Sequence, residues 1–352
     1  MSHGVRRVLQ NKEALEAKKL KDQSKIRDYI TLTSDVLNRK KQNDWSSQAF
    51  QLTTELLQVN PEFYTIWNYR RRILLNGIIP QSTPEQIRDI LAEELSMTMA
   101  ALKVHPKVYW IWNHRGWCLD NVPSGPGTEQ EGDPRGWEKG FWDRELFVVE
   151  KMLDADPRNF HAWSYRRIVL ANMPIPKPLT AELAYTTRKI EANFSNFSAW
   201  HQRSKVLSSL WSKGELDSNK SKEEGASGIL YHEYISNSSL KEFDLVHNAM
   251  YTDPYDQSVW IYHRWLIGSG DDKDILEREI EVIQSLLEEE SGSKWCMESL
   301  VHYKRLLLSN HASTTDTSTL KRDCMGLLRR LLEVDPSRRA RYEEIELEIA
   351  RL

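Results

Sequence analysis

A short segment that recurs along the chain constrains its fold more than any other feature. Three copies carry a proline, an aromatic residue three positions later, a tryptophan six positions after the proline, and an arginine three positions after the tryptophan, and two further copies keep part of this pattern. Self-similarity at a period of roughly 40 residues or more is typical of stacked supersecondary units. The copies lie at 60–71, 105–115, 156–167, 193–203 (with Phe194 in place of proline) and 253–264 (with His263 at the arginine position).

Each copy is predicted to be the second helix of a helix pair. Proline is tolerated at the first helical position, and Asn60 and Asp156, which precede it, are good N-caps. The aromatic residue and the tryptophan share one helix face, so we expect both rings in the core. Thr83 and Thr180 are predicted to cap first helices. The predicted pairs are 45–59 with 61–76, 83–104 with 106–119, 137–155 with 160–172, 181–192 with 197–212, and 229–251 with 255–268.

These elements predict an all-α fold, a right-handed α-solenoid of about seven helix pairs with a concave binding surface. Residues 294–308 form a degenerate sixth copy after a helix at 271–290, and the last pair, 320–334 with 337–352, has lost its tryptophan, as a capping repeat requires. Residues 1–40 are expected to form a charged helical segment, followed by the repeat domain at 41–352, with loops at 121–136 and 214–228.

Composition narrows the class of protein. The net charge of −3 does not suggest a general nucleic-acid binder. Three cysteines without paired spacing indicate a reducing compartment and argue against a zinc site in this chain. No apolar run reaches transmembrane length, and the N-terminus has no signal-peptide core. We therefore expect a soluble, cytoplasmic protein.

The residues alone favour a binding or scaffold subunit, because no catalytic signature is present. The repeat arginines are interpreted as structural, each paired with a carboxylate or carbonyl of a neighbouring helix; a basic stripe for an anionic ligand is the alternative. The histidines in the second helices are interpreted as packing or hydrogen-bonding residues. The predicted anchors are Trp67, Trp112, Trp163, Trp200 and Trp260, and the repeat arginines are Arg70, Arg115, Arg166 and Arg203.

Lys107 differs from the repeat residues. Its position holds Glu62, Arg158, Ser195 and Tyr255 in the other copies, so the stack does not require lysine there. It is predicted to lie in the first helical turn, where free N–H groups favour an anion. A plain solvated lysine is the alternative that the residues alone favour.

The repeat Pro-x-x-Tyr/Phe-x-x-Trp-x-x-Arg resembles that of the protein prenyltransferase α-subunits, over essentially the whole chain. Residues 3–7, directly followed by a Lys/Glu-rich helix, are similar to the start of the Rab geranylgeranyltransferase (type II) branch. The proline-rich leader common in the other branch is absent. The chain ends at the repeats, so we expect a compact form of the subunit.

The resemblance implies an αβ heterodimer. The β-subunit would carry Zn²⁺, which activates the substrate cysteine, and the pocket for geranylgeranyl diphosphate; no cofactor is expected on this chain alone. The substrate would be a Rab GTPase presented by an escort protein. The family pattern Lys-x-Tyr-x-x-Trp-x-His-Arg matches Lys107 and Tyr109, which would stabilise the departing diphosphate, Tyr109 through its hydroxyl. His3 could reach the partner's active site, although a frayed terminus is the simpler interpretation.

Two alternatives stay open. One is the α-subunit shared by farnesyltransferase and type I geranylgeranyltransferase, which modify CaaX substrates. The other is a non-catalytic helical-repeat scaffold of the tetratricopeptide kind. The irregular, tryptophan-anchored spacing argues against the scaffold.

Overall fold

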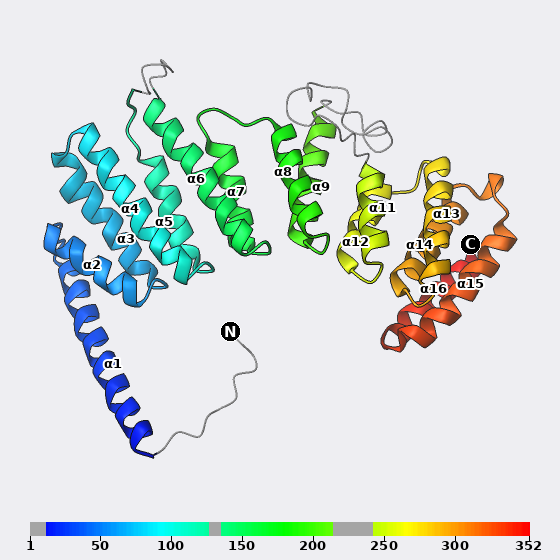
Figure 1. The fold of residues 1–352 in the computed structure, drawn as a ribbon, viewed down its shortest axis with the longest axis horizontal. Coiled ribbons are helices and arrows are strands. Elements are labelled where there is room, and N and C mark those ends of the chain that lie inside the picture. Colours follow the sequence, from blue (N-terminus) through cyan, green and yellow to red (C-terminus); the bar gives the residue numbers. More distant parts are fainter. Residues whose placement is uncertain (1–11, 127–134, 214–241) are drawn as a thin grey trace. The chain divides into compact units, whose positions relative to one another are not determined.

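Figure 1 shows the protein as a computed structural model, which describes residues 12–126, 135–213 and 242–352. Within these ranges the chain is helical, and its only β-type pairing is an isolated bridge between Gly125 and Arg135. The predicted all-α solenoid is confirmed, because successive helices pack as pairs in each of two compact units, residues 1–176 and 177–352.

The N-terminal unit contains one long helix and three helix pairs. The second helix of the first pair continues as a π-helical turn at Leu74–Ile78 and a 3-10 turn at Ile79–Gln81. The elements are α1 (Lys12–Lys41), α2 (Ser47–Val59) with α3 (Tyr64–Ile73), α4 (Pro84–Val104) with α5 (Tyr109–Asp120), and α6 (Gly136–Ala155) with α7 (Phe160–Asn172). In α1 a single buried residue, Val36, anchors the C-terminal part of the helix, whereas Leu15, Leu20, Ile26 and Ile30 are exposed.

The C-terminal unit contains the remaining pairs. Residues 229–241 of the predicted fifth pair, and the predicted loop at 214–228, lie outside the described residues. Short 3-10 turns at Ala312–Thr314 and Pro336–Arg338 precede the last two helices. The elements are α8 (Leu179–Ala192) with α9 (Phe197–Ser212), α11 (Glu242–Thr252) with α12 (Gln257–Ile267), α13 (Lys273–Glu289) with α14 (Lys294–Asn310), and α15 (Thr317–Val334) with α16 (Arg339–Arg351).

The second helices of the first two pairs begin three residues later than predicted. Their prolines lie in the turn, and the residue before each proline ends the preceding helix as its C-cap instead of beginning a new one. In the first pair the Asn60 side chain accepts a hydrogen bond from the N–H of Glu62 at 3.2 Å, within the turn. Asp156 of the third pair accepts in the same way from the N–H of Arg158 at 3.3 Å, and the helix that follows begins at Phe160 as predicted. The predicted N-cap role of Asn60 and Asp156 is therefore wrong.

The two predicted threonine caps have different outcomes. Thr83 caps α4 in a capping box, in which its hydroxyl accepts from the Gln86 N–H at 3.3 Å and its own N–H donates to the Gln86 side chain at 2.9 Å. Thr180 is not a cap, because α8 already begins at Leu179, directly after Pro178. The fixed φ of Pro178 suits the residue before a helix, so the helix begins at Leu179, two residues earlier than predicted.

The aromatic residues of the repeats are exposed, which contradicts the prediction that they are buried. Each is the first residue of its helix, and side chains on a helix lean toward its N-terminus. Their rings therefore project past the end of the helix instead of against a neighbour. The exposed fractions are 53% for Tyr64, 54% for Tyr109, 68% for Phe160 and 47% for Phe197.

The repeat tryptophans close the turns. Each is buried, and its indole N–H donates to the backbone carbonyl six residues earlier. In the fourth copy Phe194 replaces proline as the acceptor of this bond. The replacement is possible because the accepting atom is a main-chain carbonyl oxygen. The bonds are Trp67 to Pro61 (2.8 Å), Trp112 to Pro106 (3.0 Å), Trp163 to Pro157 (2.8 Å), Trp200 to Phe194 (2.7 Å) and Trp260 to Pro254 (3.2 Å).

The repeat arginine in α3 links three helices. Arg70 donates through two nitrogens to the carboxylate of Glu94 in α4, both at 2.6 Å. Its third nitrogen donates to the Phe50 carbonyl and the Thr53 hydroxyl of α2. Arg70 and Glu94 are buried, so this bidentate pair lies within the core.

The same link recurs along both units. Arg115 of α5 holds Glu145 of α6 at 2.7 and 2.5 Å, and Arg203 of α9 holds Glu242 of α11. Arg166 donates to Glu150 at 3.1 Å. His263 occupies the arginine position of the fifth copy and lies 2.9 Å from Glu279 of α13. Each of four residues thus contacts a different buried glutamate of the next helix pair: Arg70, Arg115, Arg203 and His263.

We expect Arg115→Met to lower the free energy of unfolding by about 3–5 kcal/mol, because it leaves Glu145 buried without its cation. The double variant Arg115→Met/Glu145→Leu removes the unpaired charge and should recover at least half of that loss. Urea unfolding of the full chain measures both. If the double variant were as unstable as the sum of its two single variants, the ion pair would not be the source of the effect.

A second prediction concerns His114, which is buried in α5. Arg71 Nε donates to His114 Nδ1 at 3.2 Å, so Nε2 carries the proton and donates to Glu94 at 2.9 Å. Burial, together with Arg71 and Arg70, lowers the pKa of His114 to about 4, although Glu94 opposes this shift. The native histidine is therefore neutral at pH values at which the unfolded histidine is already protonated.

The free energy of unfolding should consequently fall as the pH is lowered from about 6.5 to 4, by up to about 3 kcal/mol from this group. His114→Tyr is the matched control, because the corresponding residue in another copy, Tyr262, donates to Glu242 in the same way at 2.9 Å. Denaturant unfolding at several pH values should show a shallower fall for the variant. Identical slopes for the two proteins would contradict a neutral His114.

Candidate functional site

Lys107 lies in the turn before α5, not in its first helical turn as predicted. The helix begins at Tyr109, and the N-cap is Val108, whose side chain cannot accept a hydrogen bond. The Lys107 side chain is 70% exposed, and its Nζ lies 3.6 Å from Asp156 Oδ2. An exposed ion pair of this length contributes little, about 0–1 kcal/mol, so the ammonium group is available to a ligand.

A hollow of about 440 Å³ lies beside this turn, between α3, α5 and α7. We call it the α5 hollow. It combines aromatic rings with a small number of polar groups, which is typical of a ligand site. Its lining includes Arg71, Tyr109, Trp112, Asn113, Gly116, Trp117, Phe160, His161 and Ser164.

Arg71 brings a cation to the α5 hollow. Its Nη2 donates to the Asn113 side chain at 2.7 Å, while Nε is bound to His114. Burial lowers the pKa of Arg71, but a guanidinium remains charged in proteins. These bonds fix the side chain, so the positive charge on this side of the hollow is preorganised.

Trp112 connects the repeat framework to the site. Its indole donates to the carbonyl of Pro106, the residue directly before Lys107, and its ring packs against Tyr165 of α7 at 5.1 Å between centroids. The tryptophan that anchors the repeat therefore also fixes the turn that carries Lys107. Tyr109 contacts Trp110 edge-on at 5.2 Å, and its exposed ring lines the hollow.

His161 was not identified from the sequence, although it lines the same hollow. It is the first residue after the exposed aromatic residue of its copy, where the other copies have Thr65, Trp110, Ser198 and Ser258. The comparison between copies that singled out Lys107 would also have found it. Burial lowers the pKa of His161; Glu62 raises it and Lys107 lowers it further, so His161 lies within electrostatic reach of Lys107.

The other predicted residues lie elsewhere. Trp67, Arg70, Arg115 and Arg166 are buried among the helices of the N-terminal unit. Trp200, Arg203 and Trp260 belong to the C-terminal unit, and His3 lies outside the described residues. The structure therefore brings Lys107 and Tyr109 to the region of one hollow and leaves the repeat residues in the framework.

The α5 hollow suits an anion attached to an apolar group. Arg71 in the lining and Lys107 beside it supply positive charge, and the Tyr109 and Ser164 hydroxyls can donate hydrogen bonds. The lining also contains one carboxyl group, that of Asp120, whose pKa is raised by burial. The described part of the chain has no cluster of three or more His, Cys, Asp or Glu side chains that could hold a metal ion. Within the same residues, no helix is long and apolar enough to cross a membrane.

A family model described as "Protein prenyltransferase alpha subunit repeat" matches five segments of the chain. The matched segments are residues 46–77, 91–122, 142–173, 179–210 and 239–269. They correspond to the five clear copies together with the first helices that precede them.

Several relatives carry the name "Geranylgeranyl transferase type-2 subunit alpha". The protein of Schizosaccharomyces pombe is 38% identical, with 99% of each chain covered, and that of Saccharomyces cerevisiae is 37% identical, with 97% of each covered. The human protein is 36% identical over 78% of this chain and 43% of its own length.

A solved structure supports the fold. It is described as "Candida albicans protein geranylgeranyltransferase-I complexed with GGPP", and it matches with a TM-score of 0.63 at 20% identity, covering 92% of this chain and 91% of the other. At this identity the match concerns the architecture alone. The repeat segments and the full-length relatives together show that the chain belongs to the protein prenyltransferase α-subunit family.

Proposed function

We propose that the chain is the α-subunit of a type-2 geranylgeranyltransferase, active as a heterodimer with a β-subunit. The names of its full-length relatives support this assignment. The structural observation that carries the chemical role is Lys107, an exposed and weakly paired cation beside the α5 hollow. In this proposal the substrates are Rab GTPases with C-terminal cysteines, presented by an escort protein. The heterodimer acts in the cytoplasm.

The reaction is a nucleophilic displacement at C1 of geranylgeranyl diphosphate. The cysteine thiolate forms a carbon–sulfur bond as the C1–oxygen bond breaks, and the diphosphate leaves with the electron pair. The β-subunit supplies the isoprenoid pocket and a Zn²⁺ ion that favours the thiolate. Negative charge on the diphosphate grows during the step, so cations placed beside it lower the barrier.

In this proposal Lys107 contacts the departing diphosphate, and the Tyr109 hydroxyl donates a hydrogen bond to the same group. Arg71 and His161 shape the electrostatic potential of the hollow. Because the Lys107–Asp156 pair is long and exposed, exchanging the carboxylate for a diphosphate oxygen costs little. His3 would extend toward the partner's active site.

We expect Lys107→Ala to slow geranylgeranyl transfer by about tenfold or more, or about 1.4 kcal/mol of transition-state stabilisation. The assay is transfer of labelled isoprenoid by the chain co-produced with a type-2 β-subunit, using a Rab with escort protein and, separately, a CaaX peptide. Lys103→Ala is the matched control, because Lys103 is an exposed lysine at the end of α4. Full activity of Lys107→Ala would contradict the role of the lysine. Modification of the CaaX peptide instead of the Rab would contradict the type-2 assignment.

We expect Tyr109→Phe to lower the rate of transfer less than Lys107→Ala does, by a few-fold, because a single neutral hydrogen bond is lost, worth about 0.5–1.5 kcal/mol. The exposed ring remains, so the stability of the chain should not change. Single-turnover kinetics separate this effect from product release. Tyr64→Phe is the control, since Tyr64 starts α3 in the same way but is absent from the lining of the hollow. An unchanged single-turnover rate for Tyr109→Phe would exclude a role for the hydroxyl.

A further inference from the structure

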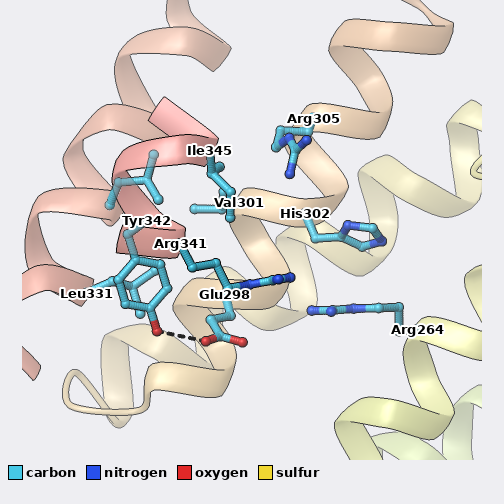
Figure 2. A pocket seen from close by; sticks show the side chains of 10 residues that line it. Arg264, Glu298, Val301, His302, Arg305, Leu331, Arg341, Tyr342 and Ile345 are labelled. Atoms are coloured by element: carbon cyan, nitrogen blue, oxygen red, sulfur yellow. Dashed lines mark hydrogen bonds between the residues drawn. The ribbon is translucent and has the colours of Figure 1, made fainter. Parts of the chain in front are cut away.

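A second concentration of positive charge lies in the C-terminal unit, at a small cavity between α12, α14, α15 and α16. Figure 2 shows this cavity, with Arg264 of α12 and Arg341 of α16 extending toward one another beside Glu298 and His302 of α14. Arg305, one turn further along α14, completes the cationic lining. We call this cavity, with the residues that line it, the α14 pocket.

The cations of the α14 pocket are incompletely paired. The Nε atoms of Arg264 and Arg305 are shielded from solvent and have no hydrogen-bond partner. No ion pair links Arg264 or Arg341 to a carboxylate within the described part of the chain. A buried N–H group of a charged side chain without an acceptor is unfavourable, so the pocket presents unused donors.

The acidic residues of the region are already engaged. Glu298 accepts hydrogen bonds from Arg338 at 2.9 Å and from the Tyr342 hydroxyl at 2.8 Å. Glu348 is paired with a terminal nitrogen of Arg305. Glu298 and Glu348 are thus engaged by other donors, and neither forms an ion pair with Arg264 or Arg341.

Comparison with an earlier copy of the repeat shows which hydrogen-bond acceptor Arg264 lacks. Arg264 lies four residues after Trp260, as Arg71 lies four residues after Trp67. Arg71 is satisfied by Asn113 and His114 of the next second helix. The corresponding residues for Arg264 are His302 and Tyr303, and His302 offers no carbonyl oxygen, so the acceptor that Asn113 supplies has been lost.

The size of the cavity limits the ligand. Its volume of about 30 Å³ corresponds to two or three water molecules. That space admits one oxyanion group and excludes a nucleotide or an isoprenoid. Arg341, which is exposed, stands at the edge of the pocket and leaves access from solvent.

We propose that the α14 pocket binds a single small oxyanion group, a phosphate or a carboxylate, through Arg264, Arg305 and Arg341. The guanidinium groups donate charge-assisted hydrogen bonds to its oxygens. None of the residues of this site belongs to the unit that holds Lys107 and the α5 hollow, so the proposal does not rest on the proposed transfer reaction.

Isothermal titration calorimetry of the full chain with inorganic phosphate and with acetate, at constant chloride concentration, tests the proposal. We expect saturable binding of at least one of the two anions, and their relative affinity distinguishes a tetrahedral group from a planar one. Arg341→Gln should weaken binding by about tenfold or more, because a charge-assisted hydrogen bond is lost. Arg339→Gln removes the same charge from an exposed residue of α16 that pairs with Glu343, and it should change the affinity less than twofold.

A spectroscopic readout on His302 keeps the test independent of heat signals. Burial and the charges of Arg264, Arg305 and Arg341 lower the pKa of His302 to about 4. A bound anion offsets these charges, so the pKa of the His302 ring, followed by NMR, should rise on addition of the anion and not in Arg341→Gln. The proposal is overturned by the absence of saturable binding, by equal loss of affinity in Arg339→Gln, or by a His302 pKa that does not respond.

Discussion

The structure depends on buried ion pairs that join successive helix pairs within each unit. Arg70 with Glu94, and Arg115 with Glu145, bring a guanidinium from one second helix onto a carboxylate of the following first helix. A buried charge without its partner is strongly unfavourable, so each pair of helices requires the next one. A hydrogen-bonding histidine can replace the arginine in this link, since His263 lies 2.9 Å from Glu279 in the C-terminal unit. Stability is thereby distributed along the repeats through interactions between neighbours.

The turns between paired helices are fixed by a different interaction, the indole bond to the carbonyl six residues earlier. Because this bond secures the backbone, the side chains within the turn are free to vary from copy to copy. Lys107 occupies one of these variable positions, directly after Pro106, whose carbonyl accepts the hydrogen bond from the Trp112 indole. A structural repeat thus provides a rigid support for one chemically distinct residue, which is how function is commonly placed on a regular scaffold.

The sequence was sufficient to predict the helix pairs and the buried tryptophans, because these depend on periodicity and on comparison between copies. The same comparison singled out Lys107, whose role stays a prediction. The sequence misplaced the start of the second helix in the first two pairs and gave Asn60 and Asp156 the role of N-caps, whereas both side chains accept a hydrogen bond from a backbone N–H of the turn. It also placed Tyr109 in the core, since a helix-face argument ignores that the first residue of a helix projects past its end. Glu94 and Glu145 could not be identified, because the separation of each from its arginine along the chain varies with the length of the connection. His161 could have been identified by the same comparison, because no other copy has histidine at that position.

Protection of Lys107 from chemical acetylation tests most directly whether this lysine contacts the diphosphate. The heterodimer would be labelled with and without geranylgeranyl diphosphate, and with geranylgeraniol, which lacks the diphosphate, as the second ligand. Mass spectrometry would compare Lys107 with the exposed Lys103. The account predicts that the diphosphate slows labelling of Lys107 alone, and that the alcohol does not. Equal labelling of Lys107 with and without the diphosphate would contradict it.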